Sequence, residues 1–339
     1  MHCGCRVGMA TLKDAFKKYF RGYKKTAVFA ITTTCNCQCV MCDMHRKKPE
    51  HISLSDAKKV LKTLEDQKFL IVYLTGGEPT LHPHVVEIVE YADELGLIPT
   101  MTSNGSVSKP LLTRLKQAGL YLLSVSLDHW DPAICETLRN HRNIMAKQLE
   151  TLQTAKSLGL KTYALAFLNP ILVKDGVEKL VDYANNVLEV PFGFCYPTKS
   201  DINSYGLGGR LSAADLSRGI QLSVKKILTS KINGSNIANL WVYLEDLLHF
   251  ENGKKPNFYC KGGEDVVYVD WRGDVYPCFL RKKMFNILRD KPWLFKDVHC
   301  NDCMINCFRE PSVLPHFLSS PHLLALEIRY SSPGKWVYR

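Results

Sequence analysis

The strongest constraint on the fold is a sixfold repeat in which a short apolar run is followed by a segment of helical length. The apolar runs cover residues 27–33, 70–75, 98–103, 122–127, 162–168 and 192–196, and the helices expected between them cover residues 53–67, 83–95, 108–118, 144–158 and 177–187. The runs show almost no polar alternation, which is typical of parallel strands covered on both faces. Strands that alternate with helices predict an α/β fold of the β/α-barrel type.

Three cysteines follow the first strand with the spacing Cys35-x3-Cys39-x2-Cys42. Cysteine thiolates hold iron-sulfur clusters, and a cubane with three protein ligands keeps one iron open. Zinc is the alternative, although structural zinc takes four ligands in spaced pairs. The spacing favours an iron-sulfur site, with Cys37 interpreted as a bystander thiol.

The second strand ends in Gly76-Gly77-Glu78-Pro79. Paired glycines let the backbone approach a ligand closely, although an ordinary tight turn explains the segment when it is taken alone. Together with the cysteine triplet, it resembles the radical S-adenosylmethionine (radical SAM) superfamily. The resemblance implies a partial (β/α)6 TIM-like barrel whose cofactors are a [4Fe-4S] cluster and SAM. It also implies reductive cleavage of SAM to a 5′-deoxyadenosyl radical, which removes a hydrogen atom from an unactivated C–H bond.

The same resemblance implies contacts to SAM at the carboxyl ends of the strands, where active sites of such sheets lie. For the polar residues among them, a turn or helix cap is the alternative, because Ser, Asn and Asp are favoured at both. The residues expected to contact SAM are Gly76, Gly77, Glu78, Asn104, Ser126, Asp128, Arg139 and Asn169.

A second group of cysteines has the spacing Cys260-x12-Gly273-x4-Cys278, followed by Cys300-x2-Cys303-x3-Cys307. The first part resembles the opening of the SPASM and twitch domains of radical SAM enzymes. That resemblance implies one auxiliary [4Fe-4S] cluster, held by Cys260, Cys278 and two of the last three cysteines. With four protein ligands such a cluster relays an electron. A structural zinc site on the same cysteines is the alternative.

These patterns divide the chain into five parts. The first is a basic amphipathic helix that either covers the barrel or lies on an anionic membrane surface. A hairpin is expected within the cysteine-rich part, with its turn at residues 271–273. The parts are the N-terminal helix at 1–24, the barrel at 25–212, a helical bridge at 213–255, the SPASM/twitch domain at 256–315 and a C-terminal tail at 316–339.

Composition adds expectations about partners and location. The chain has 44 Lys and Arg against 33 Asp and Glu, which predicts an acidic partner. It has no run of ~18 apolar residues and no signal-peptide core, and its ligand-like cysteine groups indicate a reducing cytoplasm. We expect a cytoplasmic protein, in contact with the inner membrane surface if the N-terminal helix binds lipid. Nucleic acid is not expected, because no other basic and aromatic face is found.

The end of the sixth strand supplies candidate catalytic groups. Tyr196 and Lys199 can exchange a proton and Cys195 can donate a hydrogen atom, although each is more often a packing or rim residue. The leading hypothesis is a radical SAM enzyme of the SPASM/twitch group that acts on a small molecule or lipid and takes electrons from a low-potential donor such as ferredoxin or flavodoxin. The alternatives are a peptide-modifying maturase and a zinc-stabilised binding module. About 25 residues precede the first strand, too few for the peptide-recognition domain of many maturases.

Overall fold

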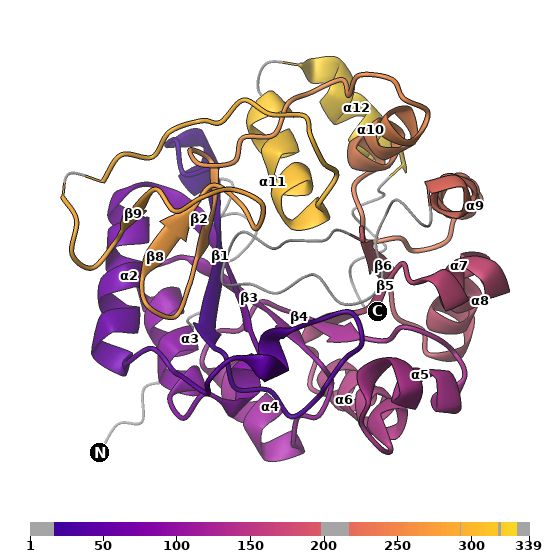
Figure 1. Cartoon of the computed structure of the whole chain (residues 1–339), viewed down its shortest axis with the longest axis horizontal. Coiled ribbons are helices and arrows are strands. Elements are labelled where there is room, and N and C mark those ends of the chain that lie inside the picture. Colours follow the sequence, from indigo (N-terminus) through magenta and orange to yellow (C-terminus); the bar gives the residue numbers. More distant parts are fainter. Residues whose placement is uncertain (1–16, 198–216, 292, 318–319, 331–339) are drawn as a thin grey trace.

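The computed structural model describes residues 17–197, 217–291, 293–317 and 320–330. Its core is a sheet with the strand order β6-β5-β4-β3-β2-β1-β7-β8-β9 (Figure 1). Strands β1 to β7 run parallel, whereas β8 and β9 pair antiparallel. The strands are β1 Lys25–Thr32, β2 Phe69–Gly76, β3 Ile98–Ser103, β4 Leu122–Ser126, β5 Lys161–Phe167, β6 Phe192–Cys195, β7 Val266–Val269, β8 Asp274–Tyr276 and β9 Phe285–Asn286.

Helices follow each strand from β2 to β5 and cover the outer face of the sheet (Figure 1). In β1 every residue after Lys25 is buried, as expected for a strand with both faces covered. The helices are α2 Leu54–Asp66, α3 Val85–Glu94, α4 Lys109–Gln117, α5 Pro132–Arg139, α6 Ile144–Ser157, α7 Pro170–Asp175, α8 Val177–Asp182, α9 Ser217–Ile232, α10 Trp241–Glu251, α11 Asn306–Phe317 and α12 Pro321–Tyr330.

The α/β fold class is confirmed, and each of the six predicted barrel strands lies within two residues of its expected bounds. Helices α5 and α7 were not predicted. Each begins with a proline after a capping side chain, Asp131 or Asn169, and is too short to show a helical apolar period. Both start just after strand ends, so they shape the side of the barrel that carries the site.

The cysteine-rich segment does not form a separate sheet. Its predicted hairpin is present as β7 and β8. However, β7 also pairs in parallel with β1, in the register Val28↔Tyr268 and Phe29↔Val269. Strand β7 therefore continues the barrel sheet and covers an edge of β1 that would otherwise be unpaired.

Within the expected C-terminal tail, residues 321–330 form α12. The Glu327 carboxylate accepts hydrogen bonds from the backbone N–H groups of Trp241 (3.1 Å) and Val242 (3.2 Å), which caps α10. The Trp241 and Tyr330 rings stack at 3.9 Å between centroids. Helix α12 therefore belongs to the packed domain, together with α10 and α11 (Figure 1).

Only the end of the predicted N-terminal amphipathic helix lies within the described residues. Lys18 Nζ donates to the carbonyls of Leu95 (3.1 Å) and Gly96 (2.7 Å), and the Tyr19 hydroxyl donates to Leu314 O (2.6 Å). The Phe20 side chain is 74% exposed. This part of the segment therefore packs on the barrel and on α11 and exposes one aromatic ring. No described helix has both the length and the apolar character to cross a membrane.

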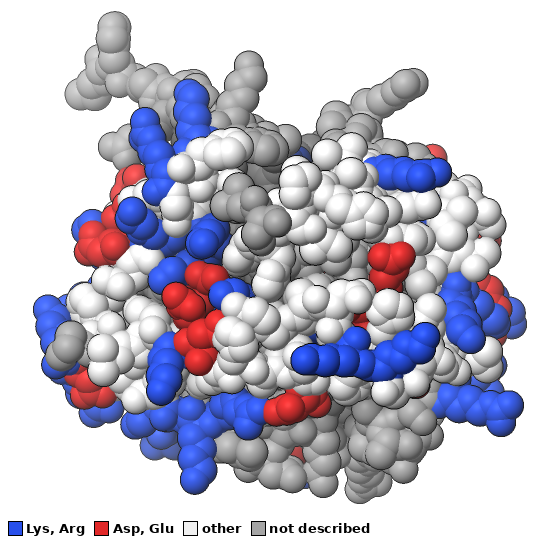
Figure 2. All heavy atoms as spheres, turned by 90° about the horizontal axis from the view of Figure 1, so that it is seen from above, with Lys and Arg blue, Asp and Glu red and all other residues white. Residues whose placement is uncertain are grey.

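The chain has a net charge of +11. On the face that Figure 2 shows, lysine and arginine side chains lie among acidic and uncharged surface. Some basic side chains of the described residues are paired, for example Arg272 with Glu50 at 2.9 Å and Lys283 with Asp274 at 3.4 Å.

Candidate active site

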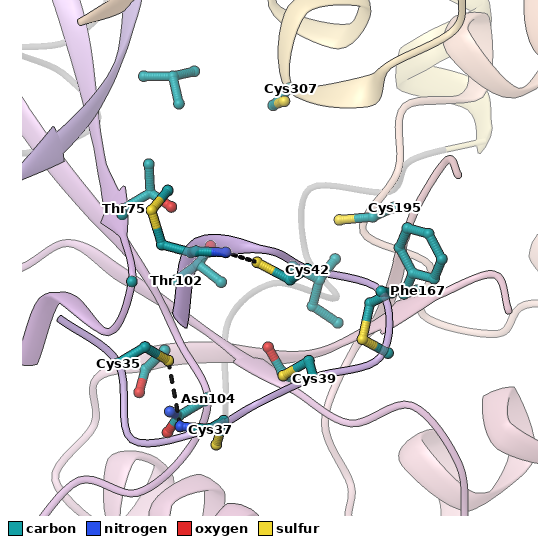
Figure 3. A pocket seen from close by; sticks show the side chains of 18 of the residues that line it. Cys35, Cys37, Cys39, Cys42, Thr75, Thr102, Asn104, Phe167, Cys195 and Cys307 are labelled. Carbon is teal, nitrogen blue, oxygen red and sulfur yellow. Dashed lines mark hydrogen bonds between the residues drawn. The ribbon is translucent and has the colours of Figure 1, made fainter. Parts of the chain in front are cut away.

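A cavity of about 210 Å³ lies where the carboxyl ends of β1 to β6 converge (Figure 3). One part of its wall comes from the loop after β1. Another part comes from the end of β6 and from the cysteine-rich segment, including the start of α11. Residues predicted as cluster ligands or SAM contacts that line it are Cys35, Cys39, Cys42, Gly76, Gly77, Asn104, Ser126, Arg139 and Cys307.

The cysteine loop is fixed by the end of helix α5. The backbone N–H groups of Gln38 and Val40 donate to the carbonyls of Arg139 (3.2 Å) and Leu138 (2.9 Å). The Arg139 guanidinium lies against the loop, with Nη1 3.7 Å from Cys39 Sγ. A helix that was not predicted from the sequence therefore sets the position of the central cysteine.

Hydrogen-bond donors face the three sulfur atoms. The backbone N–H groups of Cys37 and Met44 each lie 3.4 Å from the sulfur two residues earlier, in Cys35 and Cys42 (Figure 3). The Cys37 thiol and the Arg139 guanidinium lower the pKa of Cys39 to about 6 against the opposing effect of burial, whereas burial raises the pKa of Cys42 to about 12. Three converging thiols with N–H donors fit a [4Fe-4S] cluster, since such donors stabilise sulfur charge.

Glycine is required at residues 76 and 77 because the end of β2 lies very close to the backbone at the end of β1. The N–H groups of Gly77 and Glu78 donate to the carbonyls of Thr32 and Thr34, each at 2.8 Å. A Cβ at Gly76, where φ is +131°, would lie 2.2 Å from Thr32 O, and one at Gly77 would lie 2.3 Å from Thr34 O. Only glycine lets the end of β2 lie against the loop after β1 and border the cavity.

Replacing Gly77 with alanine is therefore expected to lower the free energy of unfolding by about 1–3 kcal/mol, because the new methyl group overlaps rigid backbone. Gly253→Ala is the control for backbone strain, since a Cβ there meets nothing within 4 Å but φ is +70°, which costs alanine about 1 kcal/mol. Urea unfolding of both variants, followed by circular dichroism, measures the difference. Equal losses in the two variants would contradict the steric explanation.

Three predicted SAM contacts do not line the cavity, because their side chains are hydrogen-bonded inside the protein. Glu78 accepts from Asn104 N (2.6 Å) and Thr80 N (3.2 Å), and Asp128 accepts from Arg139 Nε (2.5 Å) and Phe167 N (2.9 Å). Asn169 caps α7. Their side chains hold neighbouring parts of the cavity wall in place, so direct contact with SAM remains a prediction for them.

Two of the three catalytic residues predicted at the end of β6 line the cavity. Cys195 and Tyr196 line it, whereas Lys199 lies outside the described residues, as does the glycine-rich loop that follows. The Tyr196 hydroxyl donates to Glu251 Oε1 at 2.6 Å, and both burial and this carboxylate raise the pKa of Tyr196. Burial raises the pKa of Cys195 to about 12. Both groups therefore face the cavity in their neutral forms near pH 7.

The C-terminal cysteines form a second group next to the cavity. Cys260 and Cys300 pair across a β-bridge, with a backbone hydrogen bond of 2.9 Å. The N–H of Leu280 lies 3.4 Å from Cys278 Sγ, the same arrangement as at Cys35 and Cys42. The Cys260 thiol lowers the pKa of Cys300 to about 6. Among the described residues, no three His, Cys, Asp or Glu side chains lie close enough to ligate one ion.

Four residues of the cysteine-rich segment line the cavity although the sequence did not predict this position for them. They are Phe279, Ile305, Asn306 and Cys307. Cys307 was considered only as a cluster ligand, and no sequence signal placed the other three at the site. Their position depends on α11, which lies above the sheet between β1 and β6 (Figure 1).

Comparison with known proteins agrees with this geometry. Residues 29–184 match the model of the Radical SAM superfamily. The chain is 30% identical over 178 residues to a "Probable GTP 3′,8-cyclase" of Sulfolobus acidocaldarius, covering 52% of this chain and 55% of that protein. It is 25% identical over 249 residues to the "PqqA peptide cyclase" of Xanthomonas campestris pv. campestris, covering 71% and 64%. The chain thus spans about half the length of the first of these curated relatives.

Two solved structures share the fold. The S-adenosylmethionine-bound structure of Streptococcus suis SuiB matches with a TM-score of 0.63 at 18% identity, covering 85% of this chain and 71% of that one. Native anSMEcpe with bound AdoMet matches with a TM-score of 0.61 at 15% identity, covering 90% and 99%.

The parallel barrel and its thiol-lined cavity define an enzyme of the iron-sulfur class. Residues 29–184 have the sequence and the geometry of a radical SAM domain. The cofactors of that superfamily are a [4Fe-4S] cluster and SAM.

Proposed function

We propose that this enzyme removes a hydrogen atom from an unactivated C–H bond of a small molecule or lipid, with an auxiliary [4Fe-4S] cluster as an electron relay. The observation that carries the proposal is that a single cavity is lined by both the cysteine loop after β1 and the cysteine-rich C-terminal segment. When bound, the first cluster and SAM supply a 5′-deoxyadenosyl radical by one-electron cleavage of SAM.

The described residues have separate tasks at this site. Cys35, Cys39 and Cys42 hold the first cluster. Arg139 stands beside Cys39, where its guanidinium can meet a carboxylate, and Asp128 fixes its orientation through Nε. Gly76 and Gly77 line the cavity at the place where the methionine part of SAM is expected. Electrons are expected from a low-potential donor such as ferredoxin or flavodoxin.

We assign the auxiliary cluster to Cys260, Cys278, Cys300 and Cys303. At Cys278 the backbone N–H two residues later lies 3.4 Å from the sulfur, as at Cys35 and Cys42, and at the other three the N–H in the same position lowers the pKa of the thiol. Donors of this kind favour the thiolate that binds iron. A structural zinc site on the same four thiols remains the alternative, and metal analysis decides between the two.

The described cavity wall favours an uncharged or apolar substrate. Apolar side chains form much of it, including Leu165, Phe167, Phe279 and Ile305. Among the described lining residues the cationic groups are Arg139 and His45, and Arg139 already donates to Asp128. A nucleoside triphosphate, the substrate type named for the cyclase relatives, needs several cationic partners. The lining therefore favours a small molecule or lipid.

A peptide substrate is the second candidate. One relative is named a PqqA peptide cyclase, and SuiB, which has the same fold, has also been solved with its precursor peptide SuiA. Binding to liposomes compared with binding to a synthetic leader peptide separates the two candidates. Recovery on anionic liposomes, lost when Phe20 is changed to serine, would support a lipid; saturable peptide binding would support the second candidate.

The test of the proposed function is metal analysis with electron paramagnetic resonance on anaerobically reconstituted protein. We expect about eight irons per wild-type chain and a signal that changes when SAM is added. Cys278→Ala is expected to lose about four irons, to keep the SAM-dependent signal and uncoupled SAM cleavage, and to lose turnover. Four irons plus zinc in the wild type would remove the electron relay, and a chain without iron would remove the proposal altogether.

A further inference from the structure

The cysteine-rich segment carries five cysteines, and the proposed auxiliary cluster needs only four ligands. Cys307 differs from the other four in two ways. It alone among them lines the cavity. In addition, the backbone N–H that lowers the pKa of its thiol is its own, whereas at each of the other four it is the N–H two residues later.

Cys307 lies between the two groups of thiols. It is the second residue of α11, four residues after Cys303. Its strongest electrostatic partner is Cys195, the cavity thiol at the end of β6, followed by Cys278 and Cys303. Figure 3 shows Cys307 on the far side of the cavity from Cys35, Cys37 and Cys39. Two thiols from different parts of the chain thus line the same cavity, and Cys307 is the one that lies across from Cys35 and Cys39.

Both thiols are held in surroundings that keep hydrogen on sulfur. Phe279 and Ile305 line the cavity beside Cys307, and Phe167 and Leu165 line it near the end of β6. Burial raises the pKa of Cys195 and the pKa of Cys307 above the ordinary cysteine value. An S–H bond is weaker than an ordinary C–H bond, so a neutral thiol in this position quenches a carbon radical by giving it a hydrogen atom.

We propose that Cys307 is not a cluster ligand but a catalytic thiol of the cavity, which donates a hydrogen atom to a carbon-centred radical formed there; Cys195 is a second thiol that lines the same cavity. This inference rests on the proposed function. In the step, the S–H bond breaks and a C–H bond forms, which leaves a thiyl radical on Cys307. One electron from a donor of the ferredoxin or flavodoxin class, together with one proton from water, restores the thiol.

The position of the thiol predicts the type of product. A hydrogen atom from the Cys307 S–H group reaches the substrate carbon from the wall opposite the cysteine loop, and it replaces the hydrogen atom that was lost to 5′-deoxyadenosine. The substrate therefore leaves isomerised, by inversion at the carbon or by rearrangement of its radical, and not oxidised.

The experiment uses reconstituted enzyme with SAM and dithionite in D2O, without substrate, so that SAM is the only probe. The S–H groups exchange with solvent, and the fraction of 5′-deoxyadenosine that carries deuterium is measured by mass spectrometry. We expect this fraction to fall about tenfold in Cys307→Ser, because the serine O–H bond is too strong to donate a hydrogen atom. The control is Cys135→Ser, at a buried thiol that donates to His129 O (3.1 Å) and does not line the cavity.

Iron content distinguishes the two roles of Cys307 independently of turnover. A cavity thiol predicts that Cys307→Ser keeps about eight irons, whereas Cys303→Ser loses about four. The inference is overturned if Cys307→Ser loses four irons, if its deuterium fraction equals that of the control, or if wild-type 5′-deoxyadenosine carries no deuterium. Wild-type enzyme that forms no 5′-deoxyadenosine would overturn the proposed function as well.

Discussion

Replacing Cys39 with alanine is expected to abolish the formation of 5′-deoxyadenosine from SAM. Cys39 is the central cysteine of the triplet, and its sulfur is contacted by Arg139 and by the thiol of Cys37. Without it, two cysteines remain for a cluster that needs three protein ligands to leave one iron open for SAM. Chromatography of reactions with dithionite measures the nucleoside, and the iron content is expected to fall by about four per chain.

Cys37→Ala is the matched control in the same loop. Cys37 is buried between Cys35 and Cys39, yet its spacing excludes it from the triplet of ligands. We therefore expect this variant to keep its iron and to cleave SAM. If Cys37→Ala lost the cluster while Cys39→Ala kept it, the ligand assignment would be wrong.

The second large effect is expected at Arg309 in α11, whose side chain is fully buried. Its Nη2 donates to Asp246 Oδ2 (2.7 Å) and to Phe258 O (2.6 Å), and its Nη1 donates to Asn301 Oδ1 (3.0 Å). Arg309→Met removes these bonds and leaves the Asp246 carboxylate buried without its cation. Breaking such a pair costs about 3–5 kcal/mol of unfolding free energy.

Urea unfolding of the reconstituted protein measures this loss, with Arg272→Met as the control. Arg272 also pairs with a carboxylate, that of Glu50, but its side chain is 62% exposed, so its removal is expected to cost about 0–1 kcal/mol. Arg309 binds Phe258 and Asn301, which lie close to Cys260 and Cys300 in the sequence. When these bonds are lost, iron bound by the C-terminal cysteines should be the first to dissociate on partial unfolding. Similar midpoints for the two variants would show that the buried pair does not stabilise the cluster segment.

The sequence by itself determined the features that depend on short-range order. The strand and helix pattern predicted the α/β barrel because burial on both faces leaves a continuous apolar run in each strand. Two short motifs could also be found in the sequence alone: the spacing of Cys35, Cys39 and Cys42, and the Gly76-Gly77 pair. A ligand set within one loop and a backbone contact between adjacent strands require no knowledge of distant partners.

Tertiary structure decided which polar residues face the cavity and which support its wall. Asn104 and Asn169 both follow strands, yet the first lines the cavity and the second caps α7. Likewise, no local pattern indicates that β7 pairs with β1, or that α11 brings Cys307 to the cavity while Cys303 remains with the other cysteines. These outcomes depend on packing between segments more than 200 residues apart, where pairing is set by the burial of whole faces and not by the residues next to each side chain.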